Sequence, residues 1–144
     1  FFKLLIRVIL IVLCCILFIA LIIFGMIYQR KMRLKRQEQH LKGEPKEALL
    51  YALSRMDALC EAENLEKIST AADAAALQES FPTITQEKLM WLQDLLQELT
   101  FSNHAYGTEL RDETAQLYRD MASDATARQS RLKRMWYRYG RCFC

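Results

Sequence analysis

The order of apolar and charged residues divides the chain into one long apolar run and an amphipathic remainder. From Val8 to Tyr28, twenty-one consecutive residues carry no charge. An α-helix of that length is roughly 31 Å long, which matches the hydrocarbon core of a bilayer. The run therefore predicts a transmembrane helix. The alternatives are a buried core helix, which normally carries some polar residues, and a signal peptide, whose apolar part is usually shorter and ends at a small-residue cleavage site.

Basic residues follow the apolar run closely, whereas the preceding flank carries only Lys3 and Arg7. Because basic flanks stay in the cytoplasm, we expect a single pass through the plasma membrane with the N-terminus outside and the C-terminal domain cytoplasmic. The chain begins with Phe1 rather than Met, so we also expect it to start inside a longer polypeptide. The bases that set this topology are Arg30, Lys31, Arg33, Lys35 and Arg36.

Residues 1–42 then form the span and its basic exit, and residues 43–144 form a helical cytoplasmic domain. Gly43-Glu44-Pro45 breaks the first helix, and apolar residues at three- and four-residue steps predict an amphipathic helix over 46–62. A short helix is expected over about 70–78. Ser80-Phe81-Pro82 ends it, with Phe81 in the core.

Two longer helices complete the predicted domain. The Thr83-x-x-Gln86 signature is typical of a helix start, and Gly107 is expected to supply a left-handed helix stop. A final helix is expected from Thr108 to Gly140. The fold class is therefore all-α: one N-terminal transmembrane helix followed by a small antiparallel helical bundle. The predicted core residues are Leu89, Leu92, Leu96, Leu99, Tyr106, Leu110, Leu117 and Met121.

Charge is segregated along the chain in a way that the net charge of +3 conceals. Residues 1–42 hold eight basic and one acidic side chain, residues 43–127 hold six basic and sixteen acidic, and residues 128–144 hold six basic and none acidic. A nucleic-acid reader would need a basic surface on the folded domain, so this class is disfavoured. The first basic cluster is explained by topology alone. Either end is also suited to anionic lipid.

Residues suited to catalysis or metal binding are few. His40 and His104 lack a nucleophile in a recognisable motif, and the sequence contains no glycine-rich phosphate loop, His-Glu-x-x-His or calcium loop. Cys142 and Cys144 lack a second ligand pair at zinc spacing, and the odd number of cysteines outside the span suits a reducing compartment. We therefore predict no catalytic residue, no metal site, no cofactor and no small-molecule substrate.

The segment 128–143 interleaves basic and aromatic side chains. Trp and Tyr favour the headgroup region and Arg favours anionic lipid, so one hypothesis is an interfacial helix. The other is that Leu132, Met135, Trp136 and Tyr139 continue the core stripe, with the bases on its wet side. The possible interfacial residues are Arg131, Arg134, Trp136, Tyr137, Arg138 and Arg141.

Leu96-Gln97-Glu98-Leu99-Thr100 and Ala105-Tyr106-Gly107 resemble a cytoplasmic helical domain of unknown function. That domain follows the last membrane span of bacterial transglutaminase-like membrane proteins and of some single-span proteins. The similarity covers roughly residues 5–125. It implies an extracytoplasmic partner domain upstream, of the papain-like Cys-His-Asp type, and none of that triad lies in this chain.

Three functions are compatible with these patterns. The first is a membrane-anchored cytoplasmic interaction or coupling module without catalytic activity of its own, whose partners are the lipid bilayer and another protein or an upstream domain. The second is the C-terminal part of a membrane transglutaminase-like or protease-like enzyme whose active site lies upstream of Phe1. The third is a subunit of a larger membrane assembly.

Overall fold

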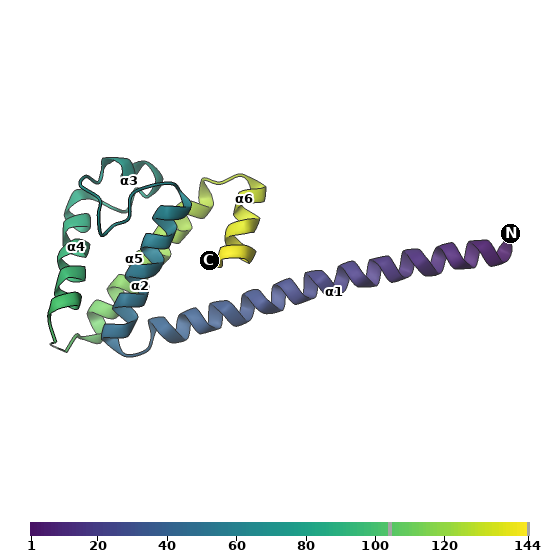
Figure 1. The fold of residues 1–144 in the computed structure, drawn as a ribbon, viewed down its shortest axis with the longest axis horizontal. Coiled ribbons are helices and arrows are strands. Elements are labelled where there is room, and N and C mark those ends of the chain that lie inside the picture. Colours follow the sequence, from purple (N-terminus) through teal and green to yellow (C-terminus); the bar gives the residue numbers. More distant parts are fainter. Residues whose placement is uncertain (104, 144) are drawn as a thin grey trace.

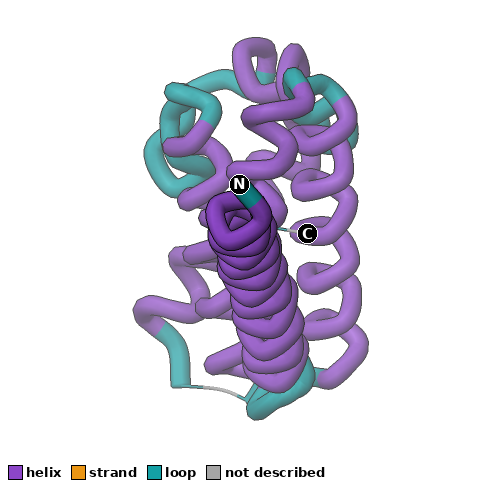
Figure 2. The backbone as a smooth tube through the Cα atoms, turned by 90° about the vertical axis from the view of Figure 1, so that its right-hand side faces the viewer, coloured by secondary structure: helices purple, strands orange, loops and turns teal. Residues whose placement is uncertain are grey.

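In the computed structural model, which describes residues 1–103 and 105–143, one long helix leaves a group of shorter ones (Figure 1). No strand occurs in these residues, which confirms the all-α class (Figure 2). The elements are α1 (Phe2–Leu41), α2 (Pro45–Ala62), α3 (Ala75–Ser80), α4 (Gln86–Phe101), α5 (Thr108–Ala127), α6 (Arg131–Met135) and a π-helical segment, η1 (Trp136–Arg141).

The helix α1 contains both the apolar run and the basic exit without a break. It is long and apolar enough to cross a membrane, and no residue of its apolar window is buried against the rest of the chain. A core helix of a soluble protein would bury much of that surface, so this alternative does not fit the structure. Only Leu41, at the last turn, enters the core.

The domain is built around α2 and α5, which pack along most of their length. Arg111 at the start of α5 donates to the Lys42 carbonyl before α2, and Gln129 after α5 donates to Glu63 after α2. The two helices therefore run in the same direction. The intervening α4 runs the opposite way, so consecutive long helices alternate in direction (Figure 1).

The helix periodicity predicted the buried faces. The predicted core residues Leu89, Leu92, Leu99, Leu117 and Met121 are buried. Three others, Leu96, Tyr106 and Leu110, are half-buried and pack against the same core. The buried face of α2, with Phe81 at the predicted corner, completes the core: Ala48, Leu49, Ala52, Leu53, Met56, Leu59 and Cys60.

Two predicted helix starts are wrong because side chains bind the backbone at other positions. The short helix begins at Ala75 rather than near residue 70, since the Asp73 carboxylate accepts the Ala75 N–H (3.1 Å). The helix α4 is capped by Thr85, whose hydroxyl accepts the Lys88 N–H (3.3 Å). Thr83, predicted as the cap, instead bonds to Asp124 in α5.

Two predicted helix ends are also wrong. Gly107 has φ −78° and is the residue before α5, because α4 has already ended at Phe101 and Ser102 after it is extended. The last helix ends at Ala127 instead of Gly140. Ser130 then accepts the Lys133 N–H (3.5 Å) and starts a new helix in another direction, which allows the aromatic segment to fold back on α2.

Candidate functional site

The C-terminal segment returns to α1 just beyond the apolar run. Arg33 donates to the Gly140 carbonyl (3.2 Å), and the Arg30 guanidinium lies 5.4 Å from the centroid of the Tyr139 ring. These arginines follow Tyr28 by two and five residues, so they lie about 3 and 8 Å further along the helix axis. The structure thus brings together the two basic ends of the chain, which are about one hundred residues apart in sequence.

Arginines from two helices cap the end of this segment. The last carbonyls of a helix lack intrahelical partners and carry partial negative charge. Besides the Arg33 bond, one nitrogen of Arg55 in α2 donates to the Arg141 and Cys142 carbonyls (3.1 and 3.2 Å). The segment therefore ties α1 to α2 through two cationic caps.

Aromatic packing fixes the segment from the inner side. Tyr137 is fully buried, and its ring meets Phe143 edge-on at 5.4 Å. The Tyr137 hydroxyl donates to Glu63 Oε1 (2.6 Å). Burial raises the pKa of Tyr137, and the hydrogen bond to Glu63 raises it further. Tyr118 in α5 donates to the Phe143 carbonyl (3.3 Å), so α5 also contacts the segment.

The predicted interfacial residues divide into two groups. The prediction of an interfacial position is wrong for Tyr137, because its side chain is buried in the domain. Arg134 turns inward and donates to the Thr126 and Gln129 carbonyls at the end of α5 (3.2 and 3.3 Å). Arg131, Trp136, Arg138 and Arg141 are exposed.

The competing hypothesis of a continued core stripe is wrong for three of its four residues, and the fourth, Tyr139, is half-buried. Leu132 is 81 % exposed, Met135 55 % and Trp136 48 %. The buried residues of this segment are instead Tyr137, Cys142 and Phe143. The turn at residues 128–130 rotates the new helix relative to α5, so extrapolating the α5 stripe selects the wrong face.

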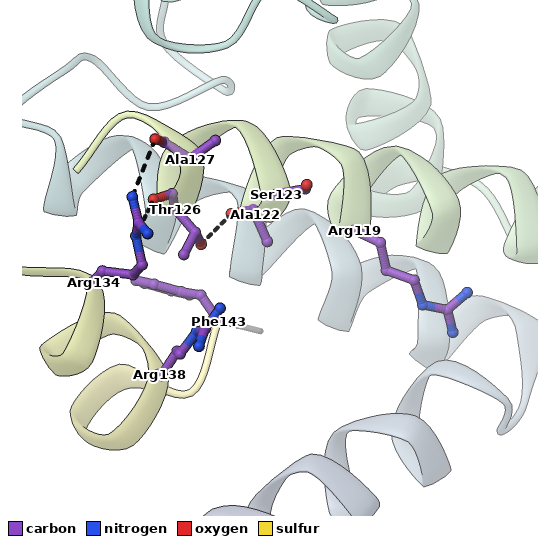
Figure 3. Close-up of a pocket in the computed structure, with 8 residues that line it drawn as sticks. All are labelled: Arg119, Ala122, Ser123, Thr126, Ala127, Arg134, Arg138 and Phe143. Atoms are coloured by element: carbon purple, nitrogen blue, oxygen red, sulfur yellow. Dashed lines mark hydrogen bonds between the residues drawn. The ribbon is translucent and has the colours of Figure 1, made fainter. Parts of the chain in front are cut away.

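An arginine-lined groove of about 550 Å³ separates α5 from η1. Its lining includes Arg119, Arg134 and Arg138 over Phe143, and contains no carboxylate. Figure 3 shows Arg134 directed at the end of α5 while Arg138 lies beside Phe143 and Arg119 further along the helix. Arg134 is bonded to the end of α5, so Arg119 and Arg138 are the guanidinium groups that face the groove beside the Phe143 ring. Guanidinium groups beside an aromatic ring favour an anionic ligand with an apolar part.

A second groove, of about 490 Å³, has the opposite charge. It lies between α4 and α5, beside the half-buried Trp91, and three carboxylates line it: Glu87, Glu113 and Asp120. The acidic middle of the sequence therefore covers α4 and α5, while the basic ends meet at α1 and η1. The folded domain is electrically polar.

The other basic residues that predicted the topology, Lys31, Lys35 and Arg36, are exposed on the outside of α1. His40 stacks on Tyr51 with ring centroids 5.0 Å apart. His104 and Cys144 lie outside the described residues.

Reactive groups within residues 1–103 and 105–143 are not assembled into a site. No three His, Cys, Asp or Glu side chains cluster at metal-binding distance among them. Burial raises the pKa of Cys60 to about 12, so its thiol stays protonated.

Comparison of the chain with protein-family models, with curated proteins and with solved structures finds no match. The contacts of Arg33, Arg55 and Glu63 with the C-terminal segment were not foreseen from the sequence. The only sequence signal for the turn that permits them is Ser130, which is suited to a helix cap.

Proposed function

We propose that the chain is a single-pass membrane protein whose helical domain lies in the cytoplasm and acts as an interaction and coupling module. The observation that carries the proposal is the docking of η1 on α1 directly beyond the apolar run. A flexible tether would leave the domain free to rotate relative to the span. Here α1 continues unbroken from the apolar run into the domain, where it contacts α2, α5 and η1.

Orientation is supported by charge. The bases between residues 30 and 36 outnumber Lys3 and Arg7 on the other flank. Protease added to intact cells should therefore leave the domain uncut, and protease added to inside-out vesicles should digest it. Digestion from the outside of intact cells would contradict this orientation.

Coupling is tested by the distance between span and domain in nanodiscs. Spin labels carried on p-acetylphenylalanine at Leu21 and Ser123, both exposed, leave the native cysteines unchanged. The wild-type chain should give one narrow distance distribution. Arg33→Met should broaden it, because the bond to the Gly140 carbonyl is lost.

Lys35→Met is the matched control, since it removes one positive charge from the same exit helix at an exposed position. It should leave the distribution narrow. An equally broad distribution in the wild-type chain, or no difference between the two variants, would show that the docked segment does not couple the domain to the span.

A further inference from the structure

One apolar face of the domain is exposed among the residues that the structure describes. Leu132, Met135 and Trp136 are spaced at i, i+3 and i+4, which places them on one side of α6 and the start of η1. All three are exposed although Tyr137, the next residue, is buried. The segment is therefore two-sided, with Tyr137 and Phe143 towards the core and this face towards the outside.

The face lies at a defined height along α1. Tyr139 and Gly140 contact Arg30 and Arg33, only about 3 to 8 Å beyond the last residue of the apolar run. Figure 1 shows α6 on the side of the domain towards which the apolar part of α1 extends, while α4 lies on the opposite side. If α1 spans the bilayer, α6 lies at the level of the headgroups and α4 lies away from them.

Charge around the face is uniformly basic. Arg131, Arg138 and Arg141 are exposed, and residues 128–143 contain no carboxylate. The acidic residues that approach the segment are already paired. Glu63 accepts from Tyr137 and lies 3.7 Å from Lys133, and Glu38 on α1 is bonded to Lys42 (2.6 Å).

We infer that the apolar face formed by Leu132, Met135 and Trp136, together with the exposed bases Arg131, Arg138 and Arg141 of the same segment, binds the anionic headgroup region of the membrane that α1 crosses. This inference rests on the proposed membrane span. Trp at the interface and Arg near anionic lipid are the chemistry that such a surface favours. A second attachment point close to the first acts at a high effective concentration, so it fixes the tilt of the domain even when each contact is weak.

The chain contains two tryptophans, and this permits a direct test. Trp91→Phe leaves Trp136 as the reporter, and Trp136→Phe leaves Trp91 on α4 as the matched control. The full-length chain is placed in nanodiscs of phosphatidylcholine, with or without phosphatidylglycerol, that contain bromine-labelled acyl chains as quenchers. Trp136 fluorescence should be quenched at least twofold more than Trp91, and more strongly in the anionic discs.

Arginine substitutions test the charge requirement. In the Trp91→Phe background, Arg131→Gln with Arg138→Gln should reduce quenching in anionic discs to the level of neutral discs. Lys67→Gln with Lys88→Gln removes the same charge from exposed positions elsewhere and should have no effect. Arg141 is left unchanged because its guanidinium lies 5.1 Å from the Trp136 ring and would alter the emission directly.

Three results would overturn the inference: equal quenching of the two tryptophans, equal quenching in neutral and anionic discs, or the same loss in both double variants. Hydrogen exchange of residues 131–141 in the wild-type chain gives a second measurement that needs no substitution, and exchange should be slower in anionic discs. Failure of the proposed span is seen separately, because alkaline carbonate would then extract the chain from membranes before any fluorescence is measured.

Discussion

Replacing Tyr137 by Phe removes one oxygen atom from a fully buried side chain and leaves its ring in place. The main bond lost runs from the hydroxyl to Glu63 Oε1 at 2.6 Å, while the Ala62 carbonyl is a more distant acceptor at 3.4 Å. Hydrogen bonds to a charged acceptor contribute about 1.5–3 kcal/mol. Glu63 keeps Gln129 as a donor at 2.7 Å, so its carboxylate is not left unpaired. We therefore expect the free energy of unfolding to fall by about 2 kcal/mol, towards the lower part of that range.

A double-mutant cycle isolates this bond. Glu63→Gln keeps the shape of the acceptor but removes its charge, so Tyr137→Phe in that background should cost only about 1 kcal/mol, the value of a neutral hydrogen bond. Unfolding of the full-length chain by urea in detergent micelles, followed by near-ultraviolet circular dichroism, measures both costs. Hydrogen exchange of residues 136–143 shows whether the segment detaches before the domain unfolds.

Tyr139→Phe is the control, because none of the hydrogen bonds among the described residues involves the Tyr139 hydroxyl. It should change the free energy of unfolding by less than about 0.5 kcal/mol, as is usual for such sites. The reasoning is refuted if Tyr137→Phe costs no more than this control, or if it costs the same with Glu63 and with Gln at position 63.

Three further predictions concern other parts of the domain. Thr85→Ala should destabilise the domain by about 1 kcal/mol in the same urea assay, because the cap bond to the Lys88 N–H is lost, and an unchanged midpoint would contradict the assigned cap. Cys60 should not react with maleimide at pH 7 until urea unfolds the domain, since its thiol is buried and has a pKa of about 12. Mass spectrometry of the peptide that contains Cys60 would detect labelling of the folded chain, which would contradict this prediction. Burial also raises the pKa of Tyr137 and of Tyr118, so both hydroxyls stay protonated in the folded chain at a pH where they ionise in the unfolded chain. The free energy of unfolding should therefore be constant below about pH 10 and fall above it by up to about 1.4 kcal/mol per pH unit for each tyrosine. Alkaline urea titrations measure this slope, and a flat profile to pH 11 would show that these hydroxyls are not buried.

The resemblance to the helical domain of transglutaminase-like membrane proteins stays a prediction. It rests on Leu96–Thr100 and Ala105–Gly107, which lie on α4 and in the loop before α5. Apolar residues at these positions serve the core of the domain in any case, since Leu99 is buried and Tyr106 half-buried. The resemblance implies an upstream Cys-His-Asp domain, so the gene sequence on the 5′ side of the Phe1 codon would test it most directly.

The sequence by itself determined the elements that depend on local pattern. An uncharged run of bilayer length gave the long exposed helix α1, and three- and four-residue apolar spacing gave the buried faces of α2, α4 and α5. Pro45 marked the start of α2, and Phe81, which precedes a proline, marked the end of α3. Both could be predicted because proline restricts only its own backbone and that of the residue before it. Even the charge pattern, basic at both ends and acidic between, could be read directly.

Only the tertiary structure decided what the C-terminal segment does. Three residues, 128–130, turn the chain, and the buried side of the segment then depends on which remote groups can receive it. Tyr137 is buried because Glu63 accepts its hydroxyl, and the carbonyls after Tyr139 are capped because Arg33 and Arg55 reach them. These partners lie about 75 to 107 residues away in sequence, so no local periodicity could identify them. The same turn leaves the basic apolar face of α6 directed outward.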